Sequence, residues 1–128
     1  MTLAYSCLLI AILLPYVWAG VAKRRLIKDK AYDNNNPRLQ MSALEGVELR
    51  ANWAQQNSFE ALPGFIAAVL VAHLAGVSQG VIDTLAVVHV VSRVAYGICY
   101  IKDLATPRSL VWTLGLFATI GLFVAAFL

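Results

Sequence analysis

Four long apolar runs, separated by shorter polar segments, set the pattern of this chain. The first run, from Met1 to Ala22, carries no charge, and about 20 apolar residues suffice for a helix to cross a hydrocarbon core of about 30 Å. The other three runs are also long enough. We therefore predict an all-α integral membrane four-helix bundle with one domain over residues 1–128 and spans at about 2–23, 44–75, 79–102 and 107–128.

Turn and cap residues predict where these helices begin and end. Lys23 to Glu48 is the only extended polar segment, and its stretch "DNNNPR" (Asp33 to Arg38) has the composition of a loop. Ser42 followed by Glu45 resembles a capping box, which predicts that the second helix begins near there. In the stretch "TPR", Pro107 is expected at the first position of the fourth helix.

The composition agrees with a membrane protein and argues against several other classes. Hydrophobic residues make up 60% of the chain, charged residues make up 13%, and the mean hydropathy is +0.72, which leaves too little polar surface for a soluble domain. The basic residues behind the net charge of +3 are not interleaved with exposed aromatics, so nucleic-acid binding is not expected. Cys7 and Cys99 lie inside apolar runs, without the spacing of a disulfide framework or a metal site.

Lysines and arginines flank the apolar runs unevenly. Those that directly follow the first run are Lys23, Arg24, Arg25, Lys28 and Lys30. The third connection is also basic, whereas the second has no lysine or arginine. By the positive-inside rule, the first and third loops are cytoplasmic and both termini lie outside. The compact chain with plain termini favours a bacterial inner membrane.

Polar residues inside the apolar runs form two stripes at helical spacing. An arginine at the centre of a membrane helix costs about 2.5–3.5 kcal/mol, so it is expected to face the bundle and to have a partner. The stripe on the third span consists of His89, Arg93, Tyr96 and Tyr100. The stripe on the second span consists of Arg50, Trp53, Asn57 and Glu60. We expect the two stripes to face a common interior.

Two interpretations of these stripes remain open. In the structural one, Glu60 neutralises Arg93 and the amides bond the backbone. In the functional one, the surplus donors of Arg93, Tyr96 and Tyr100 bind an anionic, peptide-like ligand that enters from the cytoplasmic side. His89 is either a hydrogen-bonded packing residue or a base.

Arg108 is a further candidate, at the start of the fourth span. The guanidinium lies beside a helix N-terminus, where the helix dipole favours an anion. It is either an interfacial positive-inside anchor or a group that holds or generates an anion, for instance by stabilising a thiolate. The sequence contains no Gly-rich phosphate loop, Ser/His/Asp set or Cys/His metal cluster.

Two segments resemble those of a known family. "AQQNSFEALPGF" is similar to the second-helix signature of the MAPEG family, the membrane-associated proteins of eicosanoid and glutathione metabolism. That signature has Asn, two residues, Glu or Asp, two residues and Pro, which are here Asn57, Glu60 and Pro63. "RVAYGICYIKDLATPRS", from Arg93 to just past Arg108, resembles the family's third-helix and turn segment. The resemblance covers nearly the whole chain.

The resemblance implies a homotrimer that binds glutathione between adjacent subunits at the cytoplasmic side, with membrane lipid around it. The residues that it implies for glutathione binding are Gln55, Asn57, Glu60, Arg93, Tyr96 and Tyr100. Arg50 is added because Trp53 stands where relatives carry an arginine. The resemblance further implies that Arg108 is catalytic and lowers the pKa of the glutathione thiol, which attacks a lipophilic electrophile or hydroperoxide from the bilayer.

The function that the resemblance implies is therefore a glutathione-dependent membrane transferase or peroxidase. One alternative is a non-catalytic lipid- or ligand-binding membrane protein on the same scaffold, against which the retention of Arg108 after Pro107 argues. Another is a small multidrug-type transporter subunit. That alternative would place its ionisable residue nearer the membrane midplane and would not need Arg108.

Overall fold

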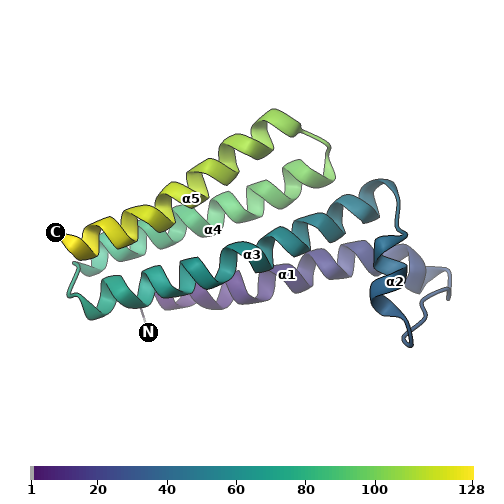
Figure 1. Cartoon of the computed structure of the whole chain (residues 1–128), viewed down its shortest axis with the longest axis horizontal. Helices are drawn as coiled ribbons and strands as arrows, with labels where there is room; N and C mark the ends of the chain where they lie inside the picture. Colours follow the sequence, from purple (N-terminus) through teal and green to yellow (C-terminus); the bar gives the residue numbers. More distant parts are fainter. Residues whose placement is uncertain (1) are drawn as a thin grey trace.

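The computed structural model describes residues 2–128, and Met1, the first residue of the predicted domain, lies outside them. Four long antiparallel helices form a bundle, and a short fifth helix lies at one end (Figure 1). The helices are α1 (Leu3–Lys28), α2 (Pro37–Ser42), α3 (Gly46–Leu74), α4 (Gln79–Ile101) and α5 (Ala105–Phe127). The four long helices are long and apolar enough to cross a membrane. The predicted all-α membrane bundle is confirmed.

The connection between the first two spans differs from the prediction. α1 continues through the basic cluster to Lys28, because its last turn places cations at the negative end of the helix dipole. The predicted capping box was wrong. The Ser42 hydroxyl donates to the Leu39 carbonyl inside α2, and α3 begins only at Gly46. Gly46 has a φ of +59°, a left-handed conformation that favours glycine and separates the two helices.

The start of α5 also differs from the prediction. The helix begins at Ala105, so Pro107 is not its first residue but lies later in the first turn. Proline fits there because N–H groups of the first turn have no intrahelical acceptor. The N–H of Arg108 donates to the Leu104 carbonyl at 3.0 Å. Arg108 therefore lies within the first turn, one turn from the α4–α5 connection.

Small residues let the helices approach closely. α1 packs mainly on α3, and α4 packs mainly on α5, while α3 and α4 join the two pairs. The buried alanines are Ala4, Ala11, Ala22, Ala51, Ala54, Ala68, Ala72, Ala86 and Ala118. Larger side chains such as Phe65, Ile82 and Leu122 fill the space between them. This is the pattern expected in lipid, where helices associate through close packing instead of through exclusion of water.

Polar contacts tie α1 to its neighbours at both ends. The Asp83 carboxylate of α4 accepts the backbone N–H of Ala4 at 2.8 Å. It thereby caps the first turn of α1 from α4, where free N–H groups favour a carboxylate. At the opposite end the buried carboxylate of Glu48 pairs with Arg24 at 3.4 Å and with Arg25 at 3.7 Å.

The bundle has a basic end and an end without lysine or arginine. The α1–α3 connection with α2 lies at the same end as the α4–α5 connection, and the two chain termini lie at the other end (Figure 1). By position in the chain, every lysine and arginine except Arg93 belongs to the connection-rich end. Arg93 alone lies about two turns inside the apolar part of α4.

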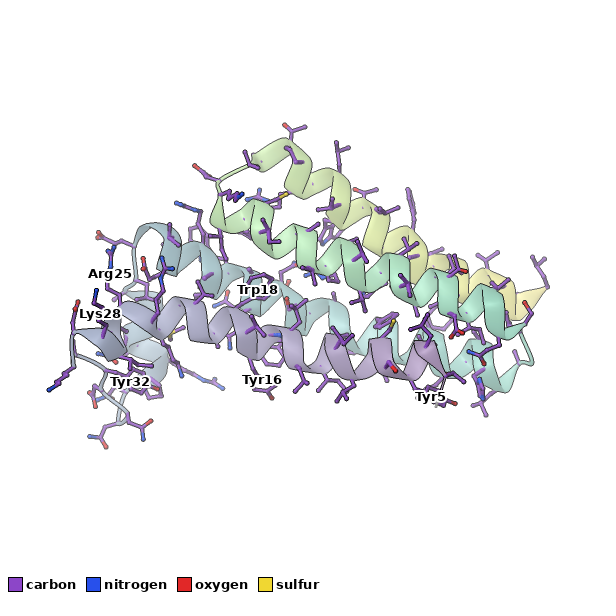
Figure 2. The ribbon with its side chains drawn as sticks, turned by 180° about the vertical axis from the view of Figure 1, so that it is seen from behind. Tyr5, Tyr16, Trp18, Arg25, Lys28 and Tyr32 are labelled. Carbon is purple, nitrogen blue, oxygen red and sulfur yellow. The ribbon has the colours of Figure 1, made fainter. Side chains whose placement is uncertain are left out.

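Trp18 of α1 packs against α4 at the level of Gly97 and Tyr100. Its side chain points from α1 toward the neighbouring helices (Figure 2), and it packs with Leu14 and Ala54 and against Tyr100. The ring covers Gly97 so closely that a Cβ added there would overlap it. Gly97 is therefore the residue that allows α1 and α4 to meet at this level.

Replacing Gly97 with alanine is expected to lower the thermal unfolding midpoint of the detergent-solubilised protein, because overpacking a core costs about 1–3 kcal/mol. Circular dichroism during heating measures the midpoint. Gly20→Ala is the matched control, because Gly20 also lies inside a helix but a Cβ there meets nothing within 4 Å. Equal midpoints for the two variants would contradict the close Trp18 contact.

Candidate functional site

Arg93 is buried in α4 without a carboxylate partner. Its side chain is 4% exposed, and its Nη2 donates to the Asn57 Oδ1 of α3 at 2.7 Å. The carboxylate of Glu60 instead accepts from the Asn57 Nδ2 at 3.0 Å. Within residues 2–128, the ion pairs are those of Glu48 alone, so the direct neutralisation of Arg93 by Glu60 is not formed. A positive charge thus lies in an apolar span, bridged to the acid only through an amide.

Two tyrosines connect Arg93 with Arg108. The Arg93 Cζ lies 4.4 Å from the centre of the Tyr96 ring, and the Arg108 Cζ lies 4.4 Å from that of Tyr100. The two rings meet edge to face at 5.5 Å. Each guanidinium is therefore oriented by a cation–π contact that uses none of its N–H donors. Apart from the Arg93 N–H that donates to Asn57, the donors of both cations stay available for an anion between or beside them.

The two tyrosines line a groove between α3 and α4, which we call the polar groove. Its volume is about 260 Å³, and its lining residues are Trp53, Gln56, Asn57, Glu60, Tyr96 and Tyr100. The groove is open to the outside, and Glu60 is exposed on its α3 side. It combines one carboxylate, two amides and two phenol groups. The cations Arg93 and Arg108 lie against its tyrosines.

Most, but not all, of the residues predicted for the site come together. Asn57, Glu60, Tyr96 and Tyr100 line the polar groove, and Arg93 bonds one of them. Arg108 reaches the groove through its contact with Tyr100, which supports the predicted common interior of the two stripes.

Arg50 and Gln55 lie elsewhere. Arg50 donates from Nε and Nη2 to the Ile101 carbonyl, at 3.2 and 3.1 Å, and so joins α3 to the C-terminal end of α4. Gln55 lines a different cavity of about 510 Å³ with Lys23 and Arg38, on the side of α3 that faces α2. Neither residue lines the polar groove.

Gln56 is a lining residue that sequence reasoning missed. It lies one helical turn before Glu60 in α3, so both side chains point to the same side of the helix. The spacing of four residues between them is a signal that identifies Gln56. Its neighbour Gln55 is turned by about 100° around the helix axis and therefore faces α2.

His89 is held by packing and hydrogen bonds. Its Nδ1 lies 3.1 Å from the Gly115 carbonyl and 3.0 Å from the Thr119 hydroxyl. Its ring stacks on Phe65, with centres 3.8 Å apart and planes at 9°. These contacts agree with a hydrogen-bonded packing residue. Within residues 2–128, no group of three or more His, Cys, Asp or Glu side chains is arranged to hold a metal ion.

Comparison with known proteins agrees with the fold. No curated protein matches the chain. The model of the MAPEG family matches residues 3–128, which is nearly the complete chain. The family consists of membrane four-helix bundles, in agreement with the fold described above, and membership supports a membrane function in glutathione or eicosanoid metabolism. The chain belongs to the MAPEG family.

Proposed function

We propose that this protein is a glutathione-dependent membrane transferase or peroxidase that acts on lipophilic electrophiles or hydroperoxides. The observation that carries the proposal is the buried guanidinium of Arg93, which has no carboxylate partner within residues 2–128. It contacts Asn57 and Tyr96, which line the polar groove together with the exposed acid Glu60. A charge in that environment is stable only when a ligand or a network compensates it.

Glutathione matches the polar groove group by group. It has one ammonium group, two carboxylates, two amide bonds and a thiol. Glu60 is the carboxylate that takes the ammonium group, and Asn57 already orients it at 3.0 Å. Arg93 and the hydroxyls of Tyr96 and Tyr100 supply donors for the carboxylates and the peptide backbone. A guanidinium is well suited to this role because its planar fork binds a carboxylate through two parallel hydrogen bonds.

Arg108 is the residue that we assign to thiol activation. A free thiol has a pKa of about 8.5 and is mostly protonated at neutral pH, whereas the thiolate is the nucleophile. Arg108 lies in the first turn of α5, where its guanidinium and the free N–H groups of the helix both favour an anion. Its contact with Tyr100 directs it to the polar groove.

The acceptor reaches the thiolate from the bilayer. Apolar side chains of α5 such as Leu114 and Phe117 are exposed on the bundle surface, as expected where lipid surrounds the helix. In our proposal the basic end of the bundle faces the cytoplasm, and glutathione enters from there. Glutathione thus reaches the site from water, and the lipophilic acceptor reaches the same site from the bilayer.

A homotrimer with the site between subunits accounts for Gln55. Its side chain faces away from the polar groove of its own subunit, toward a second concave surface that also carries Lys23 and Arg38. In a ring of subunits, such a surface supplies polar contacts to the groove of the adjacent copy. We therefore assign Gln55 to the site of the neighbouring subunit and Glu60 to the site of its own subunit.

Arg108→Ala is expected to lower the kcat/KM of the glutathione reaction by about 100-fold, because loss of one group that stabilises a developing anion has an effect of this size. The ultraviolet absorbance of bound thiolate should disappear in parallel. Lys102→Ala is the control, because Lys102 is an exposed cation at the same end of the bundle that does not line the polar groove.

The wild-type protein distinguishes the main alternatives in the same titration. If glutathione at millimolar concentration does not bind, the transferase proposal fails. If glutathione binds without thiolate formation or turnover, the protein is a non-catalytic ligand-binding membrane protein with the same fold.

Arg93→Leu is expected to abolish glutathione binding and to leave a folded oligomer. A buried charge without an ionic partner contributes little net stability, so an apolar replacement is tolerated by the fold. Calorimetric titration with glutathione measures binding, and light scattering of the detergent complex measures the assembly. Arg93→Lys keeps the charge without the planar fork and should bind more weakly than wild type. Dissociation of the Arg93→Leu oligomer would support the structural interpretation instead.

Mixed assemblies of Gln55→Ala and Glu60→Gln subunits are expected to regain part of the lost glutathione affinity. Each homo-oligomer has a defect in every site, whereas a mixed assembly pairs an intact Glu60 with an intact Gln55 of the adjacent subunit. Two different affinity tags allow mixed assemblies to be purified, and calorimetry counts their high-affinity sites. Binding equal to the average of the two homo-oligomers would place both residues in one subunit's site.

A further inference from the structure

A cavity at the basic end of the bundle has no role in the proposed function, and we call it the basic cavity. Its volume is about 300 Å³, and its lining residues are Arg24, Arg25, Lys28 and Glu48. The three cations lie near the end of α1, where Figure 2 labels Arg25 and Lys28, and Glu48 lies in the first turn of α3. The basic cavity shares no lining residue with the polar groove or with the cavity that contains Gln55.

Glu48 holds two of these cations from the buried side of the cavity. Its side chain is only 7% exposed, and its Oε1 lies 3.4 Å from the Arg24 Nε and 3.7 Å from the Arg25 Nε. The side chains of Arg24 and Arg25 are 58% and 73% exposed. A buried carboxylate thus fixes two guanidiniums that remain accessible from outside. This arrangement distinguishes the pair from the mobile surface lysines of the same segment.

The contacts with Glu48 leave most of the arginine donors free. Both contacts use Nε, and the Nη groups of Arg24 and Arg25 have no acceptor within residues 2–128. The planar fork of a guanidinium binds a phosphate group through two parallel hydrogen bonds. Three cations surround one carboxylate, so the cavity keeps a surplus of two positive charges. It therefore suits an anion that carries several oxygen acceptors.

An apolar face of α1 leads to the basic cavity. Ile10, Leu13 and Val17 recur at helical spacing on one side of α1, and all three are exposed. Arg24 follows Val17 by seven residues, or two helical turns, and so lies on the same side. Gly20 lies between them, and a Cβ added there would meet nothing within 4 Å. The cations therefore adjoin a surface on which an apolar chain can lie.

We propose that the basic cavity binds the headgroup of an anionic phospholipid. The phosphodiester accepts from the Nη groups of Arg24 and Arg25, Lys28 adds a third positive charge, and an acyl chain follows the apolar face of α1. In the proposed orientation this end faces the cytoplasm, where anionic lipids attract basic segments that follow a membrane span.

Two other ligands with a phosphate group fit the cavity less well. A free phosphate ion uses the same donors but gains nothing from the apolar face of α1. A zwitterionic phospholipid brings a cation of its own next to the three cations of the cavity, and like charges repel. The anionic phospholipid alone matches both the charge and the apolar surface.

Lys28→Gln tests the site without touching the arginine pairs with Glu48. Native mass spectrometry of the detergent-solubilised protein, titrated with dioleoylphosphatidylglycerol, measures the affinity for bound lipid. The variant is expected to bind about fivefold more weakly than wild type, because each basic residue near an anionic headgroup contributes by about this factor. Lys102→Gln is the matched control, since Lys102 is an exposed lysine at the same end that does not line the basic cavity. Equal affinities of the two variants would overturn the assignment.

A triple variant tests the two arginines and avoids a buried carboxylate without a cation. Arg24→Gln, Arg25→Gln and Glu48→Gln together remove two positive charges and one negative charge, so the net charge equals that of Lys102→Gln. The affinity for phosphatidylglycerol is expected to fall at least about tenfold, because two phosphate forks are lost. Circular dichroism during heating checks that the triple variant is folded. A folded triple variant that binds as tightly as Lys102→Gln would contradict the proposal, and Lys28→Gln decides if it does not fold.

Two further titrations of the wild type identify the ligand. Dioleoylphosphatidylcholine has the same acyl chains with a zwitterionic headgroup, and it should bind at least about fivefold more weakly than phosphatidylglycerol. Equal binding of the two lipids would show that the cations do not select the headgroup and would overturn the site. Inorganic phosphate at the same concentration should leave phosphatidylglycerol bound, and its displacement would assign the cavity to free phosphate instead. None of these measurements uses glutathione, so they test the lipid site independently of the proposed function.

Discussion

The hydrogen bond from Arg93 to Asn57 links the two helices that carry the polar residues of this bundle. Water is absent from the hydrocarbon core, so a guanidinium there has to be satisfied by protein groups or by a ligand. One amide oxygen and one aromatic ring satisfy only part of it. The arrangement of Asn57, Glu60 and the tyrosines around this cation defines the polar groove. The chemistry proposed for the protein follows from that unsatisfied charge.

Close packing through small residues fixes the position of these groups. The contact between Trp18 and Gly97 brings α1 against α4, and Trp18 in turn supports Tyr100, on which Arg108 rests. The same use of small side chains has the opposite result between α3 and α5. There Ala61 and Gly64 face a cavity instead of a partner, and the space remains open beside the polar groove. Glycine thus allows contact at one level of the bundle and leaves room at another.

Sequence reasoning succeeded for the residues whose position depends on one helix only. Helical spacing placed Asn57 and Glu60 on one face of α3, and it placed Arg93, Tyr96 and Tyr100 on one face of α4. It failed for residues whose contacts depend on the relative position of two helices. Arg50 was assigned to the ligand, but its guanidinium bonds the end of α4, a contact that requires the relative position of two helices. The capping box predicted from Ser42 and Glu45 does not form, because Ser42 belongs to the separate helix α2.

The sequence by itself determined the four apolar spans, the basic end and the two polar stripes. Hydrophobicity and helical period are properties of each segment alone, and the bilayer leaves a helix as the only backbone solution for such a span. Only the tertiary structure decided that Glu60 does not pair with Arg93, that Gln56 and not Gln55 lines the polar groove, and that a cavity ends at His89. These outcomes depend on the rotation and separation of neighbouring helices. Close packing between particular side chains sets both quantities, and no single segment contains that information.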